Sequence, residues 1–103
     1  MKRIMLVCSA GMSTSLLVNK MKKVASDKGV EAEIFAISAM EFDSNIESKK
    51  LDVILLGPQV RFMKDEFEKK LASKNIPLAV INMSDYGMMN GEKVLNQALV
   101  LIK

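Results

Sequence analysis

The chain alternates between short apolar runs and amphipathic stretches. Three segments each contain a continuous apolar run and predict buried strands, and a fourth segment shows the partial alternation of a strand. These four segments are residues 2–7, 31–37, 53–56 and 78–81. Between and after them, apolar residues recur at helical spacing. The helices expected from this spacing cover residues 13–28, 58–72 and 90–102.

Two segments give weaker patterns. In residues 38–50, Ser38 followed by Glu41 resembles a capping box, but Asp43-Ser44-Asn45 interrupts the helical pattern, so we expect a short helix or two fragments. Residues 82–91 are rich in turn-forming residues and predict a connection that leads to a helix capped by Asn90.

The alternating order of strands and helices predicts an α/β protein, a three-layer sandwich around a four-stranded parallel sheet. Residues 1–103 then form a single domain. Right-handed crossovers favour the flavodoxin-like strand order 2-1-3-4, an arrangement similar to that of low-molecular-weight tyrosine phosphatases. Ligands bind such sheets beyond the carboxyl ends of strands 1 and 3, where Cys8 and Gly57-Pro58 lie in this sequence.

The composition excludes several functions. The chain has no histidine and one cysteine, so it lacks a histidine base, an internal disulfide, a histidine metal ligand and a thiolate metal cluster, and we expect neither a metal nor another cofactor. A net charge of +3 with scattered lysines and no Trp argues against nucleic acid as a partner. No apolar run approaches the ~18 residues that span a membrane, and a lone thiol fits a reducing compartment, so we expect a cytoplasmic protein.

The candidate chemistry lies where the first strand ends. Cys8 is followed by small and hydroxyl residues that lead into a helix, a context that favours the thiolate form of a cysteine and offers unpaired backbone N–H groups to an anion. We therefore expect Cys8 to carry a phosphoryl group and the residues behind it to bind the phosphoryl oxygens. Those residues are Ser9, Ala10, Gly11, Met12, Ser13, Thr14 and Ser15. The alternatives are a buried, inert cysteine and an ordinary turn with hydroxyl caps.

The spacing separates a carrier from a hydrolase. Cysteine phosphatases use Cys-x5-Arg-Ser/Thr, and this chain has Thr14 where the arginine belongs. A phosphatase needs the guanidinium to stabilise the transferring oxygens. Without it, the loop can bind a phosphoryl group on sulfur but should hydrolyse it slowly.

Three stretches resemble the IIB component of the bacterial phosphoenolpyruvate-dependent sugar phosphotransferase system, of the lactose/cellobiose/chitobiose type. They are Ile4–Ser15, Asp52–Gln59 and Asp85–Val94, and the resemblance covers essentially the whole chain. It implies that a separate IIA protein, phosphorylated on histidine, passes its phosphoryl group to Cys8. The membrane permease IIC then presents the sugar that accepts it, usually a β-linked disaccharide such as cellobiose or chitobiose. The IIB protein would act as a monomer and meet the membrane only transiently, through the permease.

Two readings remain beside the carrier. One is a low-molecular-weight phosphatase, in which Asp85 could act as general acid, although a helix or turn cap with a packed Tyr86 explains that pair better. The other is a flavodoxin-like binding module with an inert cysteine. Met12, Met88 and Met89 lie in or near the loops at the carboxyl ends of the strands, where flexible methionines could meet two partners, and core filling explains them equally well.

Overall fold

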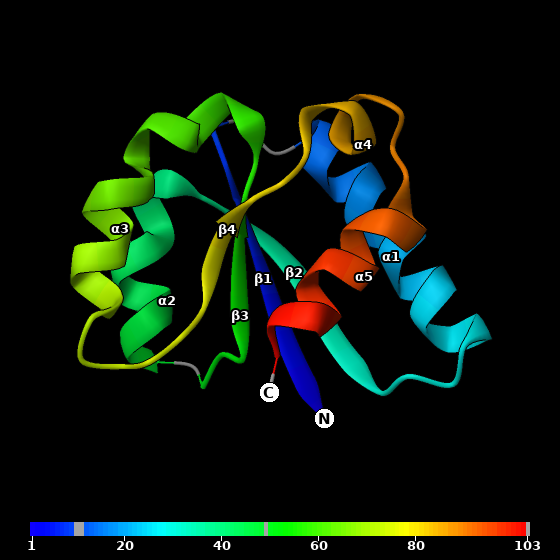
Figure 1. The fold of residues 1–103 in the computed structure, drawn as a ribbon, viewed down its shortest axis with the longest axis horizontal. Coiled ribbons are helices and arrows are strands. Elements are labelled where there is room, and N and C mark those ends of the chain that lie inside the picture. Colours follow the sequence, from blue (N-terminus) through cyan, green and yellow to red (C-terminus); the bar gives the residue numbers. More distant parts are fainter. Residues whose placement is uncertain (10–11, 49, 103) are drawn as a thin grey trace.

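The computed structural model describes residues 1–9, 12–48 and 50–102. Its four strands pair in parallel in the order β2-β1-β3-β4, which confirms the predicted fold class and strand order (Figure 1). The strands are β1 (Lys2–Cys8), β2 (Ala32–Ser38), β3 (Val53–Leu56) and β4 (Leu78–Val80). β1 lies in the middle, so its last residue stands between the carboxyl ends of its two neighbours.

Helices cover both faces of the sheet. Figure 1 shows α1 (Met12–Asp27), α4 (Met83–Gly87) and α5 (Gly91–Leu101) on one side. On the other side lie α2 (Phe42–Ser48) and α3 (Lys64–Leu71). Two short 3₁₀ segments precede them, η1 (Ala39–Glu41) before α2 and η2 (Pro58–Met63) before α3. Among the described residues, no helix is long and apolar enough to cross a bilayer.

Two apolar cores explain the continuous apolar strands. Ile4 and Leu6 of β1 pack with α1 and α5, whereas Met5 and Val7 pack with α2 and α3. All four side chains are fully buried. A strand covered on both faces has no polar face, and for this reason its sequence does not alternate.

The end of α1 follows its sequence closely. Gly29 has a φ of +71°, the left-handed conformation that glycine adopts without steric cost. The N–H of Val30 donates to the carbonyl of Ala25 at 2.8 Å, and that of Gly29 donates to Ser26 at 3.1 Å. These two bonds define a Schellman motif, which ends the helix predicted over residues 13–28.

The segment after β2 forms two helical fragments, η1 and α2, which is one of the two outcomes predicted for residues 38–50. The capping interaction is present, since the backbone N–H of Ser38 donates to the Glu41 carboxylate at 3.3 Å. The predicted interruption at Asp43-Ser44-Asn45 is wrong, because α2 runs through it. The break falls before Phe42 instead, where Ser44 Oγ and Asn45 Nδ2 both donate to the carbonyl of Glu41.

Two further segments differ from their predictions. The helix expected from Pro58 begins as η2, in which Val60 has non-helical angles, and becomes α-helical only at Lys64. The segment expected to be a turn contains the short helix α4, whose first turn is capped by Asn82 Oδ1 accepting from the N–H groups of Ser84 and Asp85. Asn90 caps α5 as predicted, accepting from the N–H of Lys93.

Replacing Gly91 by alanine is expected to destabilise the protein by about 1–3 kcal/mol, because an added methyl group overfills a packed contact. A Cβ on Gly91 would lie 2.8 Å from the carbonyl carbon of Lys20 and 2.9 Å from the nitrogen of Met21, both backbone atoms of α1. Gly87→Ala is the matched control, since nothing lies within 4 Å of its added Cβ. Urea denaturation of both variants measures the difference. Equal stabilities would contradict the close approach of α5 to α1.

Candidate functional site

Cys8 is the last residue of β1 and lies at the carboxyl end of the sheet. Its side chain is fully buried, and Sγ donates a hydrogen bond to the carbonyl oxygen of Ile37 in β2, at 3.5 Å. Cys8 pairs with Ser38 in the sheet register. The prediction that the thiol ends the central strand of the sheet is therefore confirmed, and its proton has a defined acceptor.

A backbone hydrogen bond holds the residue after β3 next to the end of β1 and its thiol. The N–H of Gly57 donates to the carbonyl of Val7 at 2.7 Å, one residue before Cys8. A Cβ on Gly57 would lie 3.3 Å from that carbonyl oxygen and 2.5 Å from Oε1 of Gln59. The side chain of Gln59 therefore folds back over Gly57, and a larger residue at position 57 would displace it.

The predicted phosphate-binding residues behind Cys8 are described only in part. Ala10 and Gly11 lie outside the described residues, and so do the side chains of Met12 and Ser13, although both residues belong to the first turn of α1. Ser9 and Ser15 are exposed.

The first turn of α1 contains no acidic residue. The positive end of the helix dipole and the unpaired N–H groups of the first turn therefore face no competing carboxylate from the helix itself. This arrangement suits an anion next to the end of β1.

Thr14 belongs to a hydrogen-bonded group that the sequence did not reveal. Its side chain is fully buried, and Oγ1 lies 3.0 Å from the hydroxyl oxygen of Tyr86. The same hydroxyl accepts a hydrogen bond from Nε2 of Gln59 at 2.8 Å. The topology places α1, η2 and α4 at the carboxyl end of the sheet, so the sequence could locate these three side chains near one another. It could not indicate which of them would bond.

Asp85 lies in the first turn of α4. Its N–H donates to Oδ1 of Asn82, and its carbonyl accepts from the N–H of Asn90. Its side chain lines a shallow hollow with Lys93 and Gln97 of α5. Asn82 is therefore the cap of α4, and Asp85 contributes only a backbone N–H to it, so the predicted capping role belongs to Asn82.

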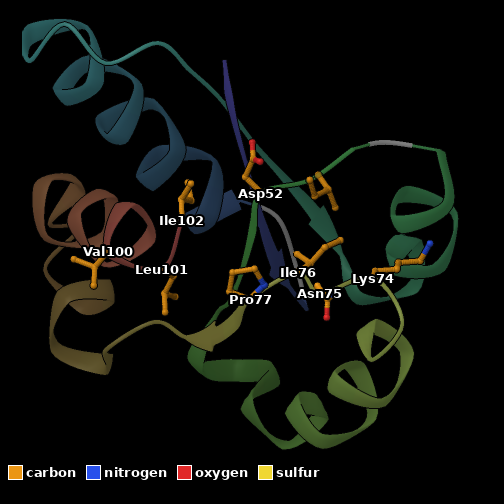
Figure 2. A pocket seen from close by; sticks show the side chains of 9 residues that line it. Asp52, Lys74, Asn75, Ile76, Pro77, Val100, Leu101 and Ile102 are labelled. Atoms are coloured by element: carbon orange, nitrogen blue, oxygen red, sulfur yellow. The ribbon is translucent and has the colours of Figure 1, made fainter.

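A separate hollow lies at the other end of the sheet. It has a volume of about 770 Å³ and is formed by segments that precede β3 and β4 and by the end of α5. Figure 2 shows Asp52, Ile76 and Pro77 on one part of its wall and Leu101 and Ile102 on another. Because parallel strands share one direction, this hollow is remote from Cys8 and takes no part in the site.

The fold and the position of the thiol define an α/β protein with one cysteine at the switch point of a parallel sheet. Residues 3–97 match the model of the family described as "PTS system, Lactose/Cellobiose specific IIB subunit". The chain belongs to this family and is a IIB subunit of a sugar phosphotransferase system.

Relatives with different sugars are almost equally similar to the chain. It is 55% identical over 100 residues to the PTS system cellobiose-specific EIIB component of Lactococcus lactis subsp. lactis, with 94% of this chain and 93% of that protein covered. It is 54% identical, with the same coverage, to the galactose-specific EIIB component of Lactococcus lactis subsp. cremoris. A solution structure of a cellobiose-specific IIB component from Borrelia burgdorferi superposes with a TM-score of 0.78 at 44% identity, covering 98% of this chain and 91% of that one.

Proposed function

We propose that the protein is a phosphoryl carrier in sugar uptake, which accepts the group on Cys8 from a histidine-phosphorylated IIA protein and passes it to a sugar bound by the IIC permease. The observation that carries the proposal is the position of Cys8, the last residue of the central strand, four positions before the start of a helix whose first turn has no acidic side chain. Membership of the IIB family supports the same role. These 103 residues include no histidine, so none of them can supply the phosphohistidine.

The first transfer is an in-line displacement at phosphorus. The Cys8 sulfur forms a P–S bond while the P–N bond of phosphohistidine breaks, and the electron pair of that bond returns to the imidazole. The thiol proton, which Ile37 accepts in the resting protein, ends on the leaving imidazole. Because Cys8 is buried, the sulfur must become uncovered before this displacement.

Backbone N–H groups from Ser9 to Ser15 would stabilise the phosphoryl oxygens. One exposed helix terminus contributes only about 0.3–1 kcal/mol, so several N–H groups must act together. In the second transfer a sugar hydroxyl forms the P–O bond, the P–S bond breaks and the thiol regains a proton. By analogy with the cellobiose-specific relative, the sugar is a β-linked disaccharide such as cellobiose.

The persistence of the phosphoryl group distinguishes the carrier from a phosphatase. Mixed with histidine-phosphorylated IIA protein that is active on its own IIB partner, the protein is expected to gain one phosphoryl group and keep it for longer than the mixing and mass measurement take. Intact-mass spectrometry and an assay for inorganic phosphate follow the two products. Rapid release of inorganic phosphate without an adduct would favour the phosphatase, and neither product would favour an inert module.

Exposed apolar side chains support docking at the end of the sheet that bears Cys8. Five of them lie on segments that follow the carboxyl ends of the four strands, with exposures from 59% to 96%. They are Leu16, Met40, Phe62, Met83 and Met88.

The methionines for which the sequence suggested a docking role differ in their exposure. Met88 is exposed and fits a docking role, whereas Met89 is packed against the core beneath α1 and α5. The side chain of Met12 lies outside the described residues. We call the five exposed side chains at this end of the sheet the apolar rim. Apolar surface of this kind is typical of sites where a partner protein binds and excludes water.

A further inference from the structure

Three side chains from three separate connections meet at one oxygen atom. The hydroxyl of Tyr86, in α4, lies 3.0 Å from Thr14 Oγ1 in α1 and 2.8 Å from Gln59 Nε2 in η2. These elements follow β4, β1 and β3, all at the end of the sheet where Cys8 lies. The hydroxyl of Tyr86 therefore joins the three segments that follow β1, β3 and β4.

The burial of Thr14 makes this contact consequential. It is the one buried polar side chain among the residues that the structure describes. A buried hydroxyl without a hydrogen-bond partner costs the folded protein about 1–3 kcal/mol of stability. The bond to Tyr86 avoids this cost and so stabilises the position of Thr14. The ring of Tyr86 packs against the core beneath α1 and α5, and this packing fixes the direction of its hydroxyl.

The Tyr86 hydroxyl can form hydrogen bonds with Gln59 and Thr14 at the same time. An amide N–H can only donate, so Tyr86 accepts from Gln59. The hydroxyl then either donates its own proton to Thr14 or accepts a second bond from it. The side chain of Gln59 also lies over Gly57, whose N–H donates to the carbonyl of Val7, next to Cys8.

We propose that Tyr86 is a positioning residue for phosphoryl transfer to Cys8. Its hydroxyl holds the first turn of α1, through Thr14, against η2, through Gln59. The N–H groups at the start of α1 thereby keep a fixed place relative to the end of β1. The role rests on the proposed function, and Tyr86 acts through its two partners without touching the phosphoryl group.

The variant Tyr86→Phe tests this role, because it keeps the packed ring and removes only the hydroxyl. We expect the maximal rate of phosphorylation by histidine-phosphorylated IIA protein to fall about 10-fold, less than the roughly 100-fold that a 1 Å misplacement can cost. The donor concentration at half-maximal rate should stay unchanged, since docking uses other side chains. Rapid-quench kinetics with intact-mass detection give both quantities. Ser84→Ala, which removes an exposed hydroxyl from the same helix, is the control and should behave like the wild type.

A double-mutant cycle separates positioning from a general loss of stability. If Tyr86 acts through Thr14, then Tyr86→Phe combined with Thr14→Val should be about as slow as the slower single variant. If Tyr86→Phe does not fold, Gln59→Leu serves instead, because Gln59 is exposed and its change removes only one donor to the hydroxyl. We expect it to slow transfer about 3-fold.

The outcomes are distinguishable from failure of the proposed function. Lack of phosphorylation of the wild type would overturn the carrier itself. A phosphorylated wild type together with an unchanged rate in Tyr86→Phe, or in Gln59→Leu if that variant is needed, would overturn the positioning role alone. A change only in the half-saturating donor concentration would also overturn it, since that would place Tyr86 in docking.

Discussion

Replacing Cys8 by serine is expected to abolish phosphorylation by the histidine-phosphorylated IIA protein. The serine hydroxyl is far less ionised than a thiol near neutral pH and has no base beside it to activate it, because the chain contains no histidine. The wild type should gain one phosphoryl group and Cys8→Ser none over the same time course. Intact-mass spectrometry of the two proteins side by side makes the comparison.

A competition experiment shows whether Cys8→Ser still folds and still binds the IIA donor. Cys8→Ser changes one buried atom and leaves the exposed apolar rim intact, so it should compete with the wild type for the donor. Added in excess, it is expected to slow wild-type phosphorylation without being phosphorylated itself. A phosphorylated Cys8→Ser would contradict the assignment of the acceptor, and a variant that neither competes nor unfolds cooperatively would report lost structure.

Two phenylalanines five positions apart should give opposite results. Phe67 is 1% exposed and stacks on Phe42 with ring centroids 3.8 Å apart, so Phe67→Ala is expected to lose about 3–5 kcal/mol of stability. Phe62 is 78% exposed, so Phe62→Ala should change stability by less than about 0.5 kcal/mol. Phe62→Ala should instead raise the donor concentration at half-maximal rate about 10-fold, since exposed aromatic residues dominate many interfaces.

Chemical denaturation and transfer kinetics on both variants test this crossed pair. At a temperature where it is still folded, Phe67→Ala is expected to accept the phosphoryl group with the wild-type concentration dependence, because it lies in the core beneath α3. Unchanged kinetics in Phe62→Ala would contradict docking through the apolar rim. A large loss of stability in Phe62→Ala would contradict its exposed position.

Most of the fold could be predicted because burial fixes the pattern of its strands. Val53–Leu56 lies between two helical layers, so every position had to be apolar, and its predicted bounds are confirmed. Gly29 and Asn90 were recognisable as helix-terminal residues for similarly local reasons. Each of these features is determined by residues that are neighbours in the sequence, so the sequence alone is enough to predict it.

The errors arose where the chain's local pattern is ambiguous. The turn-forming residues after Asn82 are equally suited to a short capped helix, and α4 was therefore missed. Asn45 reads as a helix breaker until its side chain is seen to bond with the Glu41 carbonyl.

The position of Cys8 in the site was predictable because it ends a strand, and the carboxyl ends of parallel strands lie together. The contact of Thr14 with Tyr86 was not, since the two residues are 72 positions apart and meet only after the sheet has formed. The phosphate-binding role of Ser9 to Ser15 stays a prediction.

Phosphorus-31 NMR of the wild-type protein, recorded after removal of the IIA donor, tests the central claim most directly. It reports the kind of bond that the phosphorus forms. The carrier on Cys8 predicts a single protein-bound resonance with the chemical shift of a phosphothiol, stable over the measurement and absent from Cys8→Ser. A protein-bound resonance typical of a P–O bond, or only the signal of inorganic phosphate, would contradict it.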